Sequence, residues 1–521
     1  MWLFKEIISI AYKNYFAYLF VVFFASACIL SERLFLKNSF KYKEKFAFYF
    51  ITTIINLGFS YVSADIYSVF NEKIKKSMFI VVMIAISFLM GLFISFLLKK
   101  FINLFNNKSL LLFLQENIMG IGSFIILIVR YVITVPTAVD SWHSWCYAID
   151  FSMGCSSRFL AGQILSLFCK DYVSERDIFI YCFIVGLILI TLTSILINIV
   201  VKKADKKTKP AVFFISACFV ACPANIISLF SEANFGKIEI FGLILSLFAV
   251  YIFNKIKNIT LRYGIITFLS ILSIVFYQGY VFLYYNLILT VMIFDIFEEK
   301  RINKNKLIYG IISVLFSFVT FIKFQLFNKT IFNSAEEMIA ELSQRTDIKI
   351  SEEPIKLEYF SGLKESYQLV TSYLDGFARE KILLHIVLFI PLIYFVLGVV
   401  FYFFHTGKQI YANQKLLQTR NILSFSTIFL VVPQFVLNVD WGRWMISLCV
   451  FVFFYIMYYS FKDDYSMKLT LEKTASIIKQ KPHIATLILI YIAFFSTVNS
   501  VAFTDADKLF DYIRYVFSAV I

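Results

Sequence analysis

The sequence has 521 residues, of which 60% are apolar and 16% are charged, and its mean hydropathy is +0.78. An ordinary soluble domain is about 45–50% apolar and about 25% charged. This composition excludes a disordered chain, a secreted disulfide scaffold and a standard cytosolic enzyme, and it predicts a protein with many membrane-spanning helices. The net charge of +15 is expected where cytoplasmic loops collect Lys and Arg, so it does not indicate nucleic-acid binding.

Runs of about 20 mostly apolar residues mark the expected spans. The candidates lie at 14–31, 46–63, 77–98, 117–137, 178–201, 211–230, 238–254, 259–276, 280–297, 307–327, 382–404, 421–437, 443–461 and 484–501. We therefore expect an all-α, polytopic bundle of about 12–14 transmembrane helices, with residues 1–521 forming a single transmembrane domain. The apolar stretch at 158–169 is too short to span and is expected to lie along the membrane interface.

The distribution of Lys and Arg predicts which loops face the cytoplasm. Basic residues are concentrated in alternate loops, at 202–210, 255–262, 300–306, 405–420 and 462–481. The outer face then holds 138–177, 231–237, 277–279, 328–381 and 438–442. The segments 31–45 and 71–76 are both basic yet fall on opposite sides in this count, so the orientation of the N-terminus stays open.

Two of the outer segments are long enough to form structure of their own. The loop 138–177 is expected to carry the short interfacial helix, and the polar stretch 328–381, about 54 residues long, is expected to form a lid-like loop without a core of its own. The sequence contains no phosphate-binding GxxxxGK[ST] motif, which argues against an ATP-driven pump.

The first outer constellation contains Asp140, His143, Asp150 and Arg158, together with two tryptophans. Carboxylates serve as general bases or metal ligands, and Arg pairs with phosphate. Asp140 and Asp150 are therefore the candidate catalytic residues, and His143 and Arg158 are candidates for substrate binding. The alternative is an interfacial loop with an aromatic belt.

Two further constellations lie at expected helix starts. One contains Glu232, Lys237 and Glu239, and the other contains Asp440 and Arg443. A guanidinium in the first turn of a helix, where backbone N–H groups already favour an anion, suits a phosphate or pyrophosphate clamp. The alternatives are a solvated turn around Lys237 and a local Asp440–Arg443 ion pair that fixes the bend.

A fourth constellation, Tyr277-Gln278-Gly279-Tyr280, interrupts the apolar run 263–297. Breaks in helices at membrane depth usually line a cavity, which makes Gln278 a candidate substrate-binding residue. The alternative, which the pattern favours slightly, is a plain hairpin of two helices joined by a tight turn.

Three segments resemble those of a known class of proteins: Gly154–Leu165 (GCSSRFLAGQIL), Asn234–Leu243 (NFGKIEIFGL) and Asp440–Trp444 (DWGRW). Similar pieces occur in polytopic bacterial proteins of surface-glycan assembly, described as O-antigen or capsule polymerase-like or as C-type glycosyltransferase-like. The chain differs from them in carrying Lys237 and Glu239 where Arg and Asp are expected. Asp140 and Asp150 also come later in the chain than the catalytic aspartate of the C-type enzymes.

The resemblance implies glycosyl transfer or polymerisation from a polyprenyl-phosphate-linked sugar at the outer leaflet of a bacterial cytoplasmic membrane. In this hypothesis Asp140 or Asp150 is the base or a metal ligand, while Arg158 and Arg443 bind phosphate. The expected partners are the lipid-linked glycan, the bilayer and other polysaccharide-assembly proteins, with no nucleic acid. No cofactor is assigned, and use of a divalent cation stays open. The alternatives are a lipid-linked oligosaccharide flippase and a non-catalytic scaffold.

Overall fold

The computed structural model describes residues 109–136, 139, 142–169, 172–222, 224–231, 234–297, 301–327, 329–361, 368, 371, 396–412, 414–437 and 440–495. The chain divides into two compact units, Met1–Asn117 and Ile118–Ile521. The spans predicted at 14–31, 46–63 and 77–98 lie outside the described residues.

The described part of the chain is helical apart from one pair of two-residue strands. The longer helices are α5 (Ser109–Thr134), α7 (Glu175–Lys203), α8 (Lys209–Ala221), α9 (Glu239–Phe253), α10 (Ile259–Phe276), α12 (Tyr285–Ile296), α13 (Lys304–Leu326), α18 (Lys415–Ser426), α20 (Trp441–Phe461), α21 (Tyr465–Gln480) and α22 (Pro482–Phe495), and another helix covers 396–410. The shorter elements are η1 (Ser144–Tyr147), η2 (Phe151–Met153), β1 (Gly154–Cys155), α6 (Phe159–Cys169), η3 (Ile226–Leu229), α11 (Tyr280–Leu283), β2 (Lys329–Thr330), α14 (Ala335–Arg345), α15 (Glu352–Ile355), the π turn η5 (Lys356–Phe360), η6 (Thr427–Val431) and α19 (Val432–Leu437).

Six helices of the described residues are long and apolar enough to cross a membrane. They are Glu175–Lys203, Lys209–Leu229, Ile259–Phe276, Lys304–Leu326, Lys415–Val436 and Gly442–Phe461. They indicate a membrane-embedded protein, and the predicted all-α helical class is confirmed for the part of the chain that the structure describes. The short apolar helix predicted at 158–169 is present as α6.

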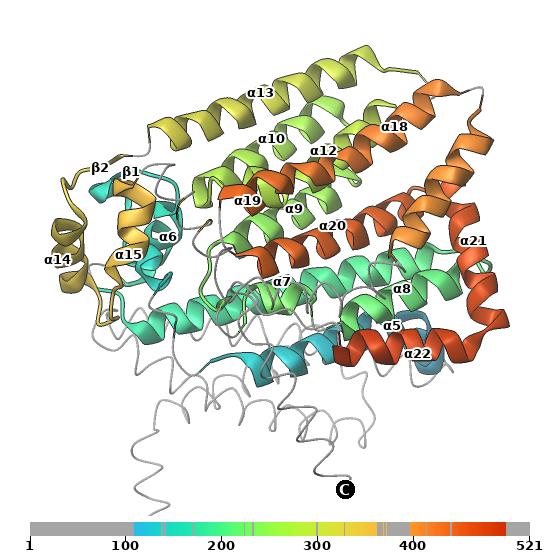
Figure 1. The fold of residues 1–521 in the computed structure, drawn as a ribbon, viewed down its shortest axis with the longest axis horizontal. Coiled ribbons are helices and arrows are strands. Elements are labelled where there is room, and N and C mark those ends of the chain that lie inside the picture. The colour runs from blue at the N-terminus through green and yellow to red at the C-terminus, as the bar shows by residue number, and fades with distance from the viewer. Residues whose placement is uncertain are drawn as a thin grey trace, which may run out of the picture. The chain divides into compact units, whose positions relative to one another are not determined.

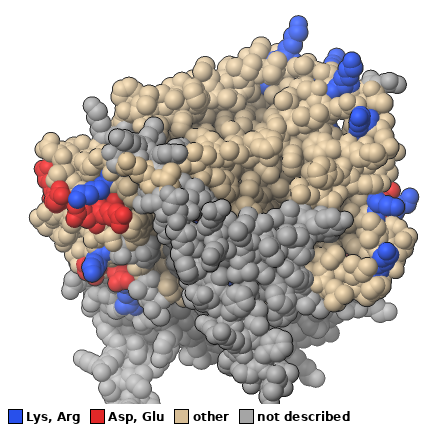
Figure 2. All heavy atoms as spheres, in the orientation of Figure 1, with Lys and Arg blue, Asp and Glu red and all other residues tan. Residues whose placement is uncertain are grey.

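The surface of the bundle fits a lipid environment. Figure 2 shows a broad uncharged surface between one end with both acidic and basic groups and another end where Lys and Arg predominate. Helix α13 crosses this uncharged surface, and its outward side chains include Ile311, Leu315 and Phe318, each more than half exposed. Because water disfavours so large an apolar face, we assign this surface to contact with lipid tails.

We call the two ends of the bundle the cap end and the basic end. At the cap end α7, α9 and α20 begin, while α10 and α13 end, next to the small elements at the left of Figure 1. At the basic end Lys203 forms an ion pair with Asp463, and Lys468 forms one with Asp205, so the loops that follow α7 and α20 lie together. The loops predicted to be cytoplasmic from their Lys and Arg content include these two.

Residues 329–361 form what we call the cap, which packs against the segment 142–175. Strands β1 and β2 pair antiparallel, with Gly154 opposite Thr330 and Cys155 opposite Lys329. Next to this pairing, the backbone N–H of Val173 donates to the carbonyl of Arg345 at 2.8 Å. The cap is therefore held by backbone hydrogen bonds at two separate places, and it covers the helix ends at which the candidate residues lie.

The interruption predicted at Gln278-Gly279 is present. Helix α10 ends at Phe276, and the chain turns through 277–279 into α11 and α12. Since Gln278 follows α10 directly and α9 begins at Glu239, the turn lies at the cap end, where helices from distant parts of the sequence meet.

Candidate functional site

Arg443 joins two of the predicted constellations. It lies in the first turn of α20, and its Nη1 donates to Glu239 Oε1 at 2.7 Å, on the first residue of α9. Its Nη2 also pairs with Asp440, the residue just before α20. The side chain of Arg443 is only 5% exposed, so this is a buried ion-pair network rather than a surface contact. The local Asp440–Arg443 pair exists, and the same guanidinium also reaches a second helix.

Arg158 joins the other two constellations to the cap. Its Nη2 donates to Glu358 Oε2 at 2.6 Å, and Gln278 Nε2 donates to Glu358 Oε1 at 2.7 Å. Ser157 Oγ donates to Gln278 Oε1, and the guanidinium of Arg158 lies over the ring of Tyr277 at 5.0 Å. The loop that carries Ser157 and Arg158, the break after α10 and the cap therefore meet at one carboxylate, Glu358.

The backbone at Arg158 is strained. Its φ of +78° is in the left-handed region, which costs a non-glycine residue about 1–2 kcal/mol. A backbone hydrogen bond from Arg158 N to Val275 O, at 3.2 Å, holds the turn against α10. Helix α6 starts at the next residue. Strain of this kind persists only where the surroundings impose it, and here it aims the guanidinium between α10 and the cap.

His143 lies close to the same cations. Burial first, and then the positive charges of Lys237, Arg443 and Arg158, hold the pKa of His143 well below its ordinary value of 6.5. The imidazole is therefore neutral at neutral pH, and its lone pair can accept a hydrogen bond. His143, Lys237, Glu239, Arg158 and Arg443 belong to one electrostatic environment, since Glu239 in turn is influenced by all three cations.

The cluster is balanced in charge but has unused hydrogen-bond donors. Its cations Arg158, Lys237 and Arg443 face the carboxylates Glu239, Glu358 and Asp440. The Nε atoms of Arg158 and Arg443 and the Nε1 atom of Trp444 are buried, with no acceptor in the structure. A buried donor without a partner costs about 1–3 kcal/mol, so three of them in one cluster favour an oxygen-rich anionic ligand.

Asp150, one of the two candidate catalytic residues, lies in contact with the cap. Its carboxylate accepts from Arg345 Nη1 at 3.1 Å and from the backbone N of Ser152 at 2.9 Å, where it caps η2. It fastens the cap rather than joining the ion pairs around Arg443. Asp140 and Glu232 lie outside the described residues. Among the residues that are described, no group of three His, Cys, Asp or Glu side chains is arranged to hold a metal ion.

Glu358 and Tyr359 were not expected from the sequence. Tyr359 accepts a hydrogen bond from Ser156 Oγ at 3.2 Å and packs edge-on against Trp145, with ring centroids 5.8 Å apart. Both residues lie in the long outer loop, which was predicted as a lid on length and composition alone. Neither residue belongs to a motif, so only their neighbours in space reveal their place in the site.

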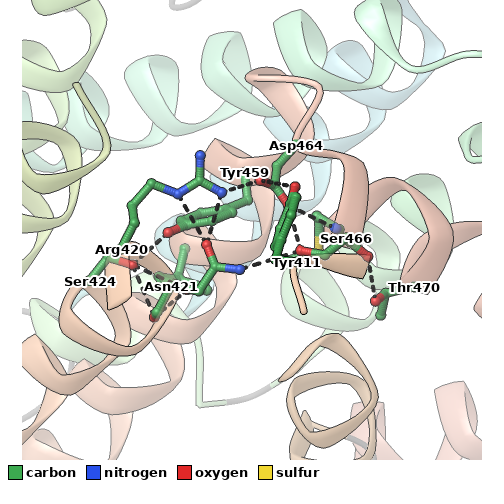
Figure 3. Close-up of polar contacts among 10 residues, drawn as sticks. Tyr411, Arg420, Asn421, Ser424, Tyr459, Asp464, Ser466 and Thr470 are labelled. Carbon is green, nitrogen blue, oxygen red and sulfur yellow. Dashed lines mark hydrogen bonds and ion pairs between the residues drawn. The ribbon is translucent and has the colours of Figure 1, made fainter. Parts of the chain in front are cut away.

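A second buried cluster lies at the basic end and has a structural character. Figure 3 shows Arg420 pairing with Asp464, which also accepts from Tyr411 Oη at 3.3 Å and caps α21 through the N–H of Met467. Arg420 also donates to Asn421 Oδ1. Because the carboxylate and the guanidinium have partners within the cluster, we read it as a connection between α18, α20 and α21 rather than a ligand site.

Comparison of this chain with protein-family models, with curated proteins and with solved structures finds no match. The class that the fold defines is a membrane-embedded helical protein, and its function has to be argued from the cap-end site.

Proposed function

We propose that the protein transfers or polymerises sugars from a polyprenyl-phosphate-linked donor at its cap end, in the biosynthesis of a bacterial surface polysaccharide. In this proposal the chain is a multi-pass protein of the cytoplasmic membrane with about 12–14 spans, and the cap faces the outer leaflet. The observation that carries it is that Arg158 and Arg443, each with a buried donor that lacks an acceptor among the described residues, both act on the neutral imidazole of His143.

This arrangement suits the chemistry of a lipid-linked sugar. The donor presents an anionic phosphate next to a polar sugar, and its leaving group gains negative charge as the glycosidic bond breaks. Arginine donors placed at that phosphate stabilise the developing charge. The acceptor hydroxyl attacks the anomeric carbon and gives up its proton to a base. Asp140 remains the candidate base, outside the described residues, and the neutral imidazole of His143 can accept a hydrogen bond that orients the acceptor hydroxyl.

The cap has a defined part in the proposal. Tyr359 and Trp145 pack against each other beside the Arg158 pair and form an aromatic wall on this side of the site. Closure of such a segment over a reacting centre excludes water, which would otherwise compete with the acceptor hydroxyl. Asp150, through its pair with Arg345, acts in this proposal by holding the cap.

A flippase for lipid-linked oligosaccharides is the second candidate, and one observation favours it. Asn286 on α12 is fully buried, and neither amide atom has a hydrogen-bond partner in the structure. Asn286 lies next to interrupted helices. The break between α11 and α12 precedes it, and Thr427 Oγ1 of η6 donates to the backbone carbonyl of Asn286 at 3.4 Å. Discontinuous helices with unpaired polar groups are common where transporters bind their cargo.

The experiment is mass spectrometry of lipid-linked glycans and surface polysaccharide from a deletion strain complemented with variants. Arg443→Ala, Arg158→Ala and Asp140→Ala are compared with Lys349→Ala, an exposed cation of the cap outside the cluster. Outward-facing single repeat units or a glycan lacking one sugar, in the three site variants only, support polymerase or transferase activity. Glycolipid accumulating on the inner leaflet supports the flippase instead. A glycan profile identical to wild type in every strain overturns both proposals.

A further inference from the structure

A cavity at the basic end of the bundle lies between α7, α9, α12 and α20. It has a volume of about 140 Å³, and its walls are mainly aliphatic and aromatic. Leu196, Val250, Leu287 and Phe454 represent the four helices on these walls. A buried apolar cavity of this size takes up a hydrocarbon group as large as benzene. It therefore has room for part of one lipid chain.

Three lysines lie at the edge of this cavity, each over an aromatic ring. Lys203 Nζ lies 4.6 Å from the ring centroid of Phe461, Lys255 Nζ lies 5.6 Å from that of Tyr251, and Lys462 Nζ lies 5.9 Å from that of Tyr458. All three rings belong to the lining of the cavity. Each lysine comes from the end of a different helix or from the residues just after it, so the ammonium groups mark the rim.

Three ammonium groups thus gather at the rim of the cavity. Lys203 also pairs with Asp463 at 2.8 Å, in a contact where both side chains are substantially exposed. Apolar walls below a ring of lysines match a molecule with a hydrocarbon chain and an anionic head.

We infer that this cavity binds an anionic glycerophospholipid from the leaflet at the basic end. One acyl chain occupies the space between α7, α9, α12 and α20, and the phosphate lies among Lys203, Lys255 and Lys462. A small soluble anion would leave the apolar walls without a partner, and a zwitterionic lipid would gain less from the three ammonium groups. The site lies at the opposite end from Arg158 and Arg443, so it does not depend on the proposed function.

Native mass spectrometry of the full chain in detergent tests the inference. Phosphatidylglycerol and phosphatidylcholine with identical acyl chains are the two probes. We expect wild-type protein to retain one phosphatidylglycerol more tightly than phosphatidylcholine. Replacing Lys203, Lys255 and Lys462 together by Gln is expected to weaken phosphatidylglycerol binding, by roughly fivefold for each lysine.

The matched control replaces Lys206, Lys207 and Lys209 by Gln, which removes the same charge from the same end but away from the cavity. Equal losses in both triple variants, or equal binding of the two lipids by wild type, overturn the inference. If the rim triple variant does not yield folded protein, Lys255→Gln alone is expected to show a roughly fivefold loss.

A second variant tests the chain rather than the head group. Val250→Phe fills the cavity, and it is expected to abolish retention of phosphatidylglycerol. Val314→Phe makes the same change on the exposed face of α13 and is expected to leave retention unchanged. Undiminished retention in a folded Val250→Phe protein shows that no chain enters the cavity, and it overturns the inference.

Discussion

Arg158 and Glu358 lie 200 residues apart in the sequence, and their side chains are joined by an ion pair 2.6 Å long. Neither side chain is more than 16% exposed. The pair belongs to the cap and to the candidate site at once, since Glu358 also receives the amide of Gln278. The cap is thus a part of the site, and variants of either one are expected to affect the other.

Gly162→Ala is expected to disrupt the packing of α6 against the outer loop. A Cβ at this position would lie 1.8 Å from the carbonyl oxygen of Ile149, which is backbone and cannot turn aside. Overpacking of this kind costs about 1–3 kcal/mol or more, so the thermal unfolding temperature in detergent is expected to fall. Gly264→Ala in α10 meets nothing within 4 Å and is expected to stabilise the helix by up to about 1 kcal/mol. Equal melting temperatures for the two variants would contradict the close approach.

His143 is expected to make the stability of the protein depend on pH. Because its pKa is lowered on folding, the unfolded chain binds a proton at a higher pH than the folded chain does. The contribution of the neutral imidazole is complete above pH 6.5 and is lost as the pH falls toward the pKa of the folded state. We expect wild type to lose more stability than His143→Gln between about pH 7.5 and about pH 5.5. Melting curves recorded for each protein at both pH values measure this difference. His483→Gln, an exposed control on α22, is expected to follow wild type.

Arg420→Met is expected to destabilise the basic end strongly. It leaves the carboxylate of Asp464, with a side chain 2% exposed, buried without its guanidinium. Removing one partner of a buried ion pair costs about 3–5 kcal/mol. The double variant Arg420→Met/Asp464→Asn removes the stranded charge while keeping an oxygen to cap α21, so it is expected to regain part of the loss. The test is a double-mutant cycle, in which thermal unfolding is measured for wild type, Arg420→Met, Asp464→Asn and the double variant. A double variant whose loss of stability equals the sum of the two single losses would count against the pairing.

Asp150→Asn is expected to loosen the cap with little effect on overall stability. The pair with Arg345 is partly exposed, with side chains 22% and 25% accessible, and such pairs contribute about 0–1 kcal/mol. Local opening of the cap depends more strongly on this pair than overall stability does, so we expect faster tryptic cleavage within 329–361. Glu353→Gln, an exposed acid of the same segment, serves as the control and is expected to be cleaved at the wild-type rate. An unchanged cleavage rate in Asp150→Asn would show that this pair does not hold the cap.

The limits of several helices could be predicted from the sequence because apolar length and charge determine them. The predicted span 259–276 has the bounds of α10, and the span predicted at 443–461 differs from α20 by two residues. The polar bend before α20 and the break at Gln278 were also visible as interruptions in apolar runs. In each case a local property of the chain sufficed.

The contacts between constellations could not be predicted in the same way. Asp440 and Arg443 are three residues apart, so their pairing follows from helix geometry. The contact of Arg443 with Glu239 depends on how α9 and α20 pack, which no local pattern encodes. Nothing in the sequence near Asp150 shows that Arg345 lies alongside it. The sequence shows which segments carry the charged residues of the site, but which residues form ion pairs with one another depends on the fold.

The Arg158–Glu358 pair also sets a condition on how a ligand enters. An anion that binds Nε of Arg158 lies beside the Glu358 carboxylate on Nη2, so the two negative charges repel and this attachment of the cap is weakened. Ligand and carboxylate thus compete for one cation, and the affinity measured for the ligand includes the free energy of weakening the Arg158–Glu358 pair. Glu358→Gln removes the competing charge, so it is expected to tighten anion binding and at the same time to loosen the cap. One contact thus controls both ligand binding and attachment of the cap.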